Sequence, residues 1–288
     1  MKIAFLCNPA PHRLKKFPAL VQAFQKHVPA QREIFLVDRG VPNSLENHIE
    51  EILNGNFDRI AVGGGDGTLN RVVNALEIRR ALARFTLGVL PLGTCNDFAR
   101  TLGFKPSRML RALSALSKDR TRVVRVARVN NHFFLNNAGF GKRNPSELRK
   151  SNLRVIGEMV PVNLKAEWNE GTLSGKFLMM LAANAPYFSG GLRFSKKSDP
   201  SDNLLEFYFV KKMFKFNLAM RLLLGRARLP LHLSRFSRMI TKVSASKLRF
   251  LTKEPVSIVV DGDPKEDLAN IHEATFEIAG TCRFVVPK

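Results

Sequence analysis

The sequence contains only three cysteines, and their positions argue against two common kinds of site. Cys7, Cys95 and Cys282 are far apart and lack the paired spacing of a metal centre. Three scattered cysteines also do not suggest a secreted protein held together by disulfides. We therefore expect reduced, mostly buried thiols and a cytosolic protein.

Long hydrophobic runs are absent as well. The apolar N-terminal stretch, residues 3–7, is too short for the core of a signal peptide. The longest apolar run, residues 177–188, is too short to cross a bilayer and is interrupted by Asn184 and Pro186. The sequence thus predicts a protein that is soluble or peripheral to a membrane.

Acidic residues are scarce relative to basic ones. The chain has 46 Lys and Arg against 24 Asp and Glu, a formal net charge of +22. Such a field favours anionic partners, whether nucleic acid, a membrane surface or phosphorylated small molecules, and says nothing about the fold. The 45% hydrophobic content of the 288 residues is enough for a sizeable core, in one large or two medium domains.

The first 120 residues alternate between two hydrophobic periods. Apolar residues at helical spacing follow each short β-type run, and these runs occupy residues 2–7, 33–37, 59–63 and 87–94. Strand–helix alternation predicts a parallel sheet covered on both faces, a doubly wound α/β domain. Ligands of such sheets collect at the carboxyl ends of the strands.

After about residue 121 the alternation stops. Short β-type runs follow one another with turn signals between them and without regular helices, which is typical of a largely antiparallel β domain. Among these runs are residues 121–129, 274–279 and 282–286. We place the first domain at residues 1–125 and the second at residues 126–288, with no obvious flexible linker between them.

The stretch AVGGGDGTLN, residues 61–70, concentrates glycine between a predicted strand and a predicted helix. Backbone N–H groups and a positive helix N-terminus would surround one small space there, which suits a phosphate group. Thr68 is suited to contacting a phosphate oxygen, and Asp66 to holding a cation or orienting a hydroxyl. The stretch is neither a Walker A sequence nor the dinucleotide fingerprint. A tight turn without a ligand remains the alternative.

A second turn of the same kind occurs in PLGTCNDFAR, residues 91–100. Gly93 and Thr94 stand at the turn, and Asn96 and Asp97 open a helix. An ordinary helix N-cap would explain Asn96 or Asp97 alone. Two Gly-Thr turns at neighbouring strand ends are harder to explain without a ligand.

Together these stretches resemble the diacylglycerol kinase catalytic-domain family, which includes bacterial lipid kinases and the sphingosine and diacylglycerol kinases. The residues that carry the resemblance are GGDGTLN (64–70), PLGTCNDFAR (91–100), Asn8-Pro9, NNAGFG (136–141), Gly190-Gly191 and DGD (261–263). Their order holds over nearly the whole chain. The resemblance implies a nucleotide domain that faces a C-terminal β-sandwich domain, with ATP in the cleft between them.

The resemblance also implies the site residues. The ATP phosphates would be bound by Asn8, Gly64, Gly65, Asp66, Gly67, Thr68, Leu69, Asn70 and Thr94. Asp263 stands where the family has a glutamate near the acceptor hydroxyl, so it is the candidate general base, with Asp261 next and Asp66 as a further catalytic candidate. An ordinary surface β-turn at residues 261–264 remains the alternative.

A structural Mg²⁺ site belongs to the family's second domain. The segment SDPSDNLLEF, residues 198–207, fits it through Asp199, Asp202 and the Leu204 carbonyl, because Mg²⁺ prefers oxygen ligands. Simple solvation of two loop aspartates is the alternative. The implied cofactors are therefore ATP and Mg²⁺.

Several residues depart from the family pattern. Residues 10–16 contain no glycine where a Ser/Gly-rich phosphate loop is usual, although His12, Arg13, Lys15 and Lys16 supply positive charge there. Asp38 would repel a phosphate, and Arg71 replaces a frequent glutamate. These departures leave open a relative that binds lipid or nucleotide without catalysis.

A basic segment, residues 207–253, contains twelve Lys and Arg among Phe, Leu and Met and no acidic residue. Such a segment suits an anionic phospholipid surface, while core helices with solvated charges are the alternative. The signatures of nucleic-acid-binding modules are absent. We expect a lipid substrate and a cytoplasmic protein peripheral to the inner face of the membrane, and a homodimer stays open.

The sequence therefore predicts an ATP-dependent lipid kinase that transfers the γ-phosphate to a hydroxyl of a membrane lipid such as diacylglycerol. An NAD kinase, which shares the GGDGT turn, is the alternative enzyme. A catalytically impaired relative is the alternative without an activity.

Overall fold

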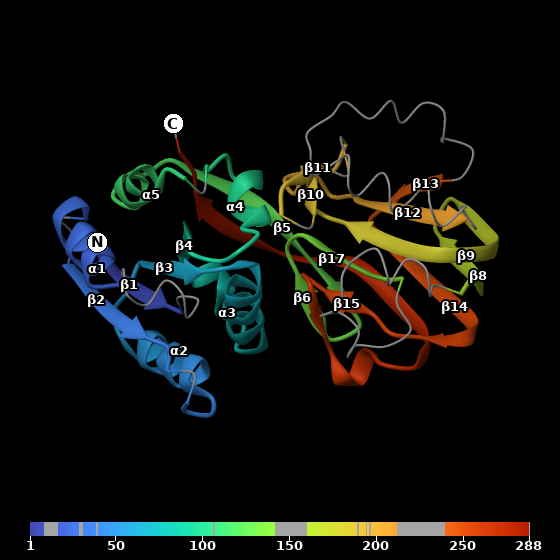
Figure 1. Ribbon diagram of the computed structural model, residues 1–288, viewed down its shortest axis with the longest axis horizontal. Helices are drawn as coiled ribbons and strands as arrows, with labels where there is room; N and C mark the ends of the chain where they lie inside the picture. Colours follow the sequence, from blue (N-terminus) through green and yellow to red (C-terminus); the bar gives the residue numbers. More distant parts are fainter. Residues whose placement is uncertain are drawn as a thin grey trace. The chain divides into compact units, whose positions relative to one another are not determined.

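A computed structural model describes residues 1–8, 17–28, 31–38, 40–105, 107–141, 160–188, 190–193, 195, 197–211 and 240–287. The basic residues predicted at 12–16 and most of the basic segment, residues 212–239, lie outside this part of the chain. The chain divides into two compact units (Figure 1). Unit 1 comprises Met1–Val126 together with Gly190, Gly191 and Gly280–Lys288, and unit 2 comprises Ala127–Phe188 and Leu192–Ala279.

Unit 1 is built on a parallel sheet with the strand order β2-β1-β3-β4-β17. The strands are β1 (Lys2–Cys7), β2 (Gln31–Leu36), β3 (Arg59–Gly64), β4 (Thr86–Pro91) and the end of β17 (Ile271–Val285). All four pairings in this sheet are parallel. The predicted doubly wound parallel sheet is confirmed.

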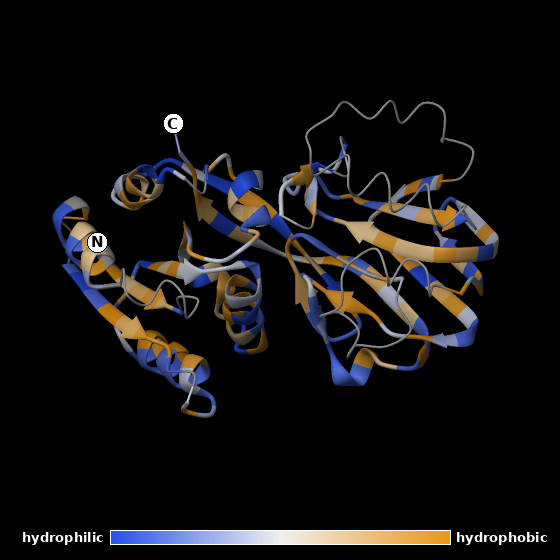
Figure 2. Cartoon of the chain, in the orientation of Figure 1, coloured by the Kyte–Doolittle hydropathy of each residue, from blue (hydrophilic) through white to orange (hydrophobic). Residues whose placement is uncertain are grey.

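Helices cover this sheet in two groups. They are α1 (Phe17–His27), α2 (Ser44–Asn54), α3 (Asp66–Ile78), α4 (Asp97–Thr101) and α5 (Met109–Ala115), with a short 3₁₀ turn at Leu82–Arg84. Helix α1 packs with α5, and α2 packs with α3, on opposite faces of the strands (Figure 1). Strands β1 and β3 are buried almost throughout because both faces of the sheet are covered. Figure 2 shows hydrophobic residues gathered on these strands and hydrophilic ones on the outer sides of the helices.

Two of the three cysteines are part of the core of unit 1. Cys7 and Cys282 are buried, and all three thiols are free. Burial raises the pKa of the Cys7 thiol to about 12 and also raises the pKa of Cys282. Reduced and mostly buried thiols were predicted, and the structure confirms them.

Unit 2 is an antiparallel structure. Its strands are the end of β5 (Thr121–Val129), which begins in unit 1, and the N-terminal part of β17, together with β6 (His132–Phe134), β7 (Asn137–Phe140), β8 (Val162–Trp168), β9 (Gly171–Ala183), β10 (Tyr187–Phe188), β11 (Leu192–Arg193), β12 (Leu205–Lys211), β13 (Ile240–Ala245), β14 (Lys247–Val256), β15 (Val259–Val260) and β16 (Asp263–Pro264). A central path runs β16-β15-β7-β9-β8-β14-β17, β12 pairs with β9 and β13, and β5 pairs with β17 and β6. The predicted, largely antiparallel second domain is confirmed.

Phenylalanine dominates the core of unit 2. Strands from both halves of the unit contribute buried rings, among them Phe134, Phe140, Phe207, Phe250 and Phe276. Phe276 alone contacts three other rings, those of Phe134, Phe207 and Phe250. Burying a large aromatic ring stabilises a core by about 1.5–3 kcal/mol, so these rings hold the strands of the unit together.

Strand β17 differs from the sequence-based prediction. Residues 274–279 and 282–286 were predicted as separate short runs, but one strand, Ile271–Val285, contains both. It pairs with β14 in unit 2 and, from residue 283 onward, with β4 in unit 1. Gly280 lies between the two predicted runs and was the reason for separating them. A Cβ at this position would lie 2.9 Å from Oε1 of Glu77. The glycine therefore allows close packing under α3 and does not end the strand.

Among the described residues, no helix is long and apolar enough to cross a membrane.

Candidate functional site

The glycine-rich stretch is shorter as a loop than the sequence suggested. Gly64 is the last residue of β3 and Asp66 is the first residue of α3, so Gly65 alone connects them. Gly65 is the N-cap of α3 in an extended conformation and provides no side-chain cap. The first N–H groups of a helix have no partner inside the helix, and they carry its positive dipole end. Helix α3 therefore begins with donors that suit an anion.

Two glycine turns pack backbone to backbone beside this helix start. A Cβ on Gly93 would lie 2.2 Å from the Cα of Gly65, so neither turn tolerates a side chain at the contact. The Gly64 carbonyl accepts hydrogen bonds from the N–H groups of Leu92 (2.9 Å) and Gly93 (3.1 Å). The Asn96 side chain holds Gly93 from the other side, accepting from its N–H at 2.9 Å and donating to its carbonyl at 2.7 Å. Glycine is needed at positions 65 and 93 because the backbones of the two turns approach each other closely there.

Gly67 has a different environment. It is exposed in the first turn of α3, and a Cβ at this position would meet no atom within 4 Å. A helical glycine is about 1 kcal/mol less favourable than alanine. Within the part of the chain that the structure describes, packing gives no reason for that cost, and the open space over Gly67 leaves room for a ligand at the backbone.

Asn8 and Thr68 are brought together beside the same turn. Asn8 follows β1, its backbone N–H donates to the Gly63 carbonyl at 2.7 Å, and its Nδ2 donates to Oγ1 of Thr68 at 3.2 Å. A Cβ on Gly64 would collide with the Thr68 side chain at 2.6–2.8 Å. These four residues therefore share one small, crowded space at the ends of β1 and β3.

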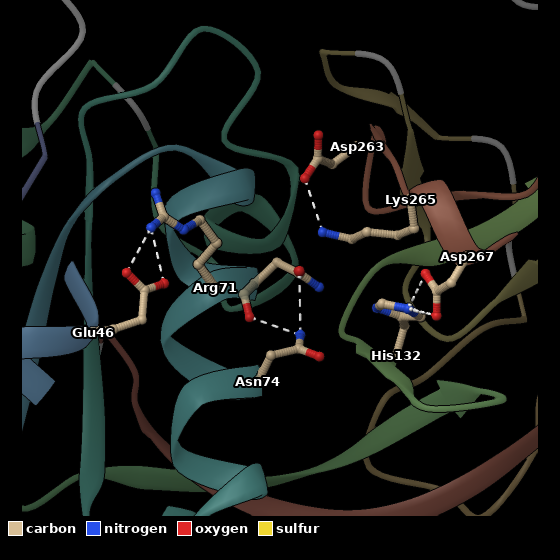
Figure 3. Close-up of polar contacts among 8 residues, drawn as sticks. Glu46, Arg71, Asn74, His132, Asp263, Lys265 and Asp267 are labelled. Atoms are coloured by element: carbon tan, nitrogen blue, oxygen red, sulfur yellow. Dashed lines mark hydrogen bonds and ion pairs between the residues drawn. The ribbon is translucent and has the colours of Figure 1, made fainter. Parts of the chain in front are cut away.

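The remaining predicted phosphate-binding residues fall into two groups. Thr94 is exposed in the second turn. Leu69 and Asn70 are buried in α3, and Asn70 accepts hydrogen bonds from Nδ2 of Asn74 at its carbonyl and its side-chain oxygen (Figure 3). Thr94 presents its side chain to solvent, whereas the side chains of Leu69 and Asn70 serve the packing of α3.

Asp66 links the two glycine turns. Its Oδ2 accepts the N–H of Asp97 at 3.0 Å, and its Oδ1 accepts the N–H of Phe98 at 2.9 Å. These N–H groups belong to the first turn of α4, whose own N-cap residue, Asn96, makes no side-chain cap. Asp66 thus caps a helix that starts 31 residues later in the chain, a role that the sequence did not reveal. Its predicted catalytic role stays a prediction.

Asp97 extends this network to a further turn. Its carboxylate accepts the N–H groups of Gly190 (3.0 Å) and Gly191 (2.6 Å), both of which have positive φ. Burial raises the pKa of Asp97, and the hydrogen bond from Gly190 opposes that shift. The sequence suggested an ordinary helix cap here. The structure instead explains why Gly190-Gly191 accompanies the PLGTCNDFAR turn.

The DGD motif of unit 2 is a tight hairpin turn. Asp261 and Gly262 both have positive φ, 48° and 86°, and they connect the paired residues Val260 and Asp263. A two-residue turn of this kind favours the Asp-Gly sequence. The β-turn that we kept as an alternative is therefore present at residues 261 and 262.

Asp261 holds this turn onto the NNAGFG motif. Its Oδ1 accepts the N–H groups of Asn136 (2.8 Å) and Asn137 (3.0 Å), and its Oδ2 accepts that of Leu135 (2.9 Å). In return, the N–H of Asp261 donates to the Asn137 carbonyl at 2.9 Å. Three backbone donors on one carboxylate explain why the two motifs occur together.

Asp263 is the more accessible of the two candidate bases. Its side chain is 53% exposed, and its Oδ2 accepts a hydrogen bond from Nζ of Lys265 at 2.9 Å (Figure 3). A few residues on, Asp267 binds Nε2 of His132 through both oxygens, at 2.7 and 2.8 Å. Asp263 is therefore the exposed carboxylate of the turn, and its role as the base stays a prediction.

The predicted metal ligands lie on one exposed loop before β12. Asp199 accepts the N–H of Ser201 and Asp202 accepts the N–H of Leu204, each at 2.9 Å. The described residues contain no group of three His, Cys, Asp or Glu side chains suited to a metal. The donors present are two carboxylates and a backbone carbonyl, all oxygen, which suit an Mg²⁺ ion that keeps several waters. The metal site stays a prediction.

The departures from the family pattern have structural partners. Arg71 binds both oxygens of Glu46 at 2.9 Å and so joins α3 to α2 on the surface (Figure 3). Asp38 accepts the N–H of Gly40 at 2.8 Å, while its own N–H donates to Oγ of Ser44 at 2.9 Å. Both residues thus stabilise the connections of α2.

Comparison with known proteins agrees with this geometry. A family model, the diacylglycerol kinase catalytic domain, matches residues 2–129. A diacylglycerol kinase of Bacillus subtilis (strain 168) is 29% identical over 171 residues, which are 54% of this chain and 56% of the relative. A protein of Pectobacterium atrosepticum named "Probable lipid kinase YegS-like" is 32% identical over 177 residues, 56% of this chain and 59% of the relative. The chain therefore matches little more than half the length of these relatives.

A crystal structure of a diacylglycerol kinase from Bacillus anthracis str. Sterne extends the likeness to the whole fold. It covers 99% of this chain and 96% of its own, with a TM-score of 0.73 and 23% sequence identity. The fold that the motifs implied is thereby confirmed, and both the parallel and the antiparallel part of the chain have counterparts in a solved structure.

Proposed function

Because residues 2–129 match the family model of the diacylglycerol kinase catalytic domain, we propose that the chain is an ATP-dependent lipid kinase. It transfers the γ-phosphate of ATP to a hydroxyl of a membrane lipid such as diacylglycerol. The observation that carries the proposal is Gly67, a helical glycine with open space around it at the positive end of α3. Phosphate is the ligand that such a helix start binds.

In this proposal the residues of unit 1 bind and orient the nucleotide. The first N–H groups of α3 and the crowded turn around Asn8 and Thr68 hold phosphate oxygens, while Thr94 contacts them from the second turn. Asp66 acts by fixing α4 against α3, which keeps the two turns at one spacing. Phosphoryl transfer depends mainly on such positioning and on neutralised charge.

Asp263 accepts the proton of the acceptor hydroxyl. The hydroxyl oxygen forms its bond to the γ-phosphorus, ADP leaves, and the proton passes to the carboxylate. Asp199, Asp202 and the Leu204 carbonyl would hold Mg²⁺ in unit 2, and this ion when bound stabilises the loop before β12 by charge. The chain works at the cytoplasmic face of a membrane, where anionic phospholipid attracts its basic segment.

Two other functions make different predictions. An NAD kinase would phosphorylate a soluble dinucleotide, and the lipid kinases among the relatives do not favour it. A relative without catalysis is the second alternative, because residues 10–16 contain no glycine where a phosphate loop is usual and because Asp66 and Asp261 bind backbone N–H groups.

One assay separates these functions. The purified chain is incubated with γ-labelled ATP, Mg²⁺ and either mixed micelles containing diacylglycerol and other extracted lipids, or NAD. Label in a lipid product supports the proposal, and label in NADP replaces it with the NAD kinase. Binding of ATP without either product identifies a relative that lacks catalysis.

A further inference from the structure

Asp263 is not isolated in unit 2. Within the described residues its ionic partner is Lys265, whose ammonium lies 2.9 Å from Oδ2. The two residues are separated by Pro264, and the backbone at Lys265 is extended, with φ −114° and ψ 135°. Side chains two positions apart in extended chain point to the same side, and the proline ring restricts the backbone between them. The pairing therefore follows from the local chain geometry.

Lys265 is unusually covered for a lysine in a surface pair. Its side chain is 19% exposed, while that of its partner is 53% exposed. Lysine carries considerable rotamer entropy, and most surface ion pairs contribute little to stability. The stem of Lys265 is covered and its ammonium is directed at one oxygen of Asp263. This arrangement indicates that the lysine fixes the orientation of the Asp263 carboxylate.

The segment that carries the pair is held at both ends. Before it, Asp261 accepts three backbone N–H groups from Leu135, Asn136 and Asn137. After it, Asp267 binds His132, and the buried Leu268 accepts the N–H of Ile258 through its carbonyl at 3.0 Å. A reactive group is most effective when its support is rigid in this way.

Resting on the proposed kinase function, we propose that Lys265 is a positioning residue for Asp263. Its ammonium holds Oδ2, so that Oδ1 is turned outward to receive the proton of the acceptor hydroxyl. Among the described residues, no hydrogen bond reaches Oδ1 of Asp263. The lysine also neutralises the carboxylate charge, which would otherwise repel the phosphates of the nucleotide. The proton passes from the hydroxyl to Oδ1, ADP leaves with the electron pair of the broken P–O bond, and Lys265 exchanges no proton.

The chain offers a matched control. Lys165 and Glu167 form another lysine–carboxylate pair two residues apart in unit 2, at 2.5 Å, but Lys165 is 56% exposed. Substituting Lys165→Met removes the same kind of pair at a distance from the hairpin, on β8. Lys265→Arg keeps the charge at the proposed position and alters only the shape of the head group.

The experiment measures kcat and KM of the full chain for wild type, Lys265→Met, Lys265→Arg and Lys165→Met, each checked for an unchanged thermal transition. We expect Lys265→Met to lower kcat by about 10- to 100-fold, the effect of a misplaced reacting group, with KM for ATP within about twofold of wild type. Lys265→Arg should recover most of kcat, and Lys165→Met should equal wild type. Wild-type kcat in Lys265→Met would overturn the proposal.

A double-mutant cycle tests whether Lys265 acts through Asp263. In the Asp263→Asn background, Lys265→Met should cost nothing further, because the group that it positions is already absent. Additive losses would show that Lys265 has a separate role and would overturn the proposal. An inactive wild type with every lipid tested would instead refute the proposed function itself, and the two failures are therefore distinguishable.

Discussion

Gly65 and Gly67 stand two positions apart, yet a methyl group should have opposite effects on stability at the two. A Cβ on Gly65 would lie 3.0 Å from the Cα of Gly93, whereas a Cβ on Gly67 would touch nothing. A substitution at Gly65 therefore disturbs the contact between the turns as well as the proposed ligand site. Gly67 is the position where ligand binding is separable from folding.

We predict that Gly67→Ala leaves the free energy of unfolding unchanged or raises it by up to about 1 kcal/mol, because alanine is the better helix former. ATP affinity should fall at least about tenfold, because the methyl group occupies the space over the first N–H groups of α3. Denaturant unfolding and nucleotide titration measure the two effects. Gly65→Ala serves as the comparison and should lose stability. Wild-type ATP affinity in Gly67→Ala would remove the phosphate assignment.

Substitutions at Asp261 and Asp263 should likewise affect different properties, stability at Asp261 and turnover at Asp263. Asp261→Asn weakens three hydrogen bonds to backbone N–H groups, and we expect a loss of about 1–3 kcal/mol in the free energy of unfolding. Asp263→Asn should leave stability near wild type and lower turnover by about 10²–10⁴, the range for a positioned acid–base group. Parallel thermal unfolding and lipid phosphorylation assays test both. If Asp263→Asn turns over at the wild-type rate, Asp263 is not the base.

The sequence identified these aspartates but not their partners. Motif patterns named Asp66 and Asp261 as functional and Asp97 as a helix-cap candidate, yet each carboxylate binds backbone groups between 31 and 126 residues away. Hydrogen bonds to a backbone N–H carry no residue-specific signal, because any residue type supplies that donor. The role of these carboxylates in joining distant turns is therefore seen in the structure and not in the sequence.

Elements with a strong hydrophobic period were predicted well. The runs at residues 2–7 and 59–63 correspond to β1 and β3, and the run at 121–129 corresponds to β5. Covered parallel strands are apolar throughout and are easily recognised. The continuity of β17 was not predictable, because strand pairing across Gly280 depends on β14 and β4, which are distant in the sequence.

Glu277 joins three strands of unit 2 through charge. It lies on β17 and binds Arg128 on β5 and, at 3.0 Å, Lys247 on β14. The hydrogen bond from Arg128, then that from Lys247, lowers the pKa of Glu277 below its usual 4.5. The folded state therefore binds this proton more weakly than the unfolded chain. The resulting stabilisation is complete above pH 4.5 and is lost as the pH falls through the lowered folded pKa.

We predict that Glu277→Gln lowers the free energy of unfolding by about 1 kcal/mol at pH 7. The difference from wild type should shrink below pH 4.5 and vanish once Glu277 is protonated in the folded protein. Urea unfolding of both proteins across this pH range measures it. A difference that is independent of pH would show that shape, not charge, accounts for the loss.

The net charge of +22 is a property of the whole molecule. Each basic residue near an anionic membrane contributes about 1 kcal/mol of attraction, and salt screens this attraction within about 10 Å at 0.1 M. We predict co-sedimentation with vesicles that contain phosphatidylserine, weak binding to purely zwitterionic vesicles, and release as salt rises toward 1 M. Equal binding to both kinds of vesicle at all salt concentrations would exclude charge as the cause.

Strand β17 also affects the order in which the molecule forms during its synthesis. The ribosome completes β1 to β4 long before it reaches β17, the strand that covers the open side of β4. Until then β4 is an unpaired sheet edge, the kind of surface that invites association with another chain. The parallel sheet of unit 1 is thus incomplete until β17 has been synthesised. The sheet that carries the proposed phosphate site is therefore complete only after unit 2 has been synthesised.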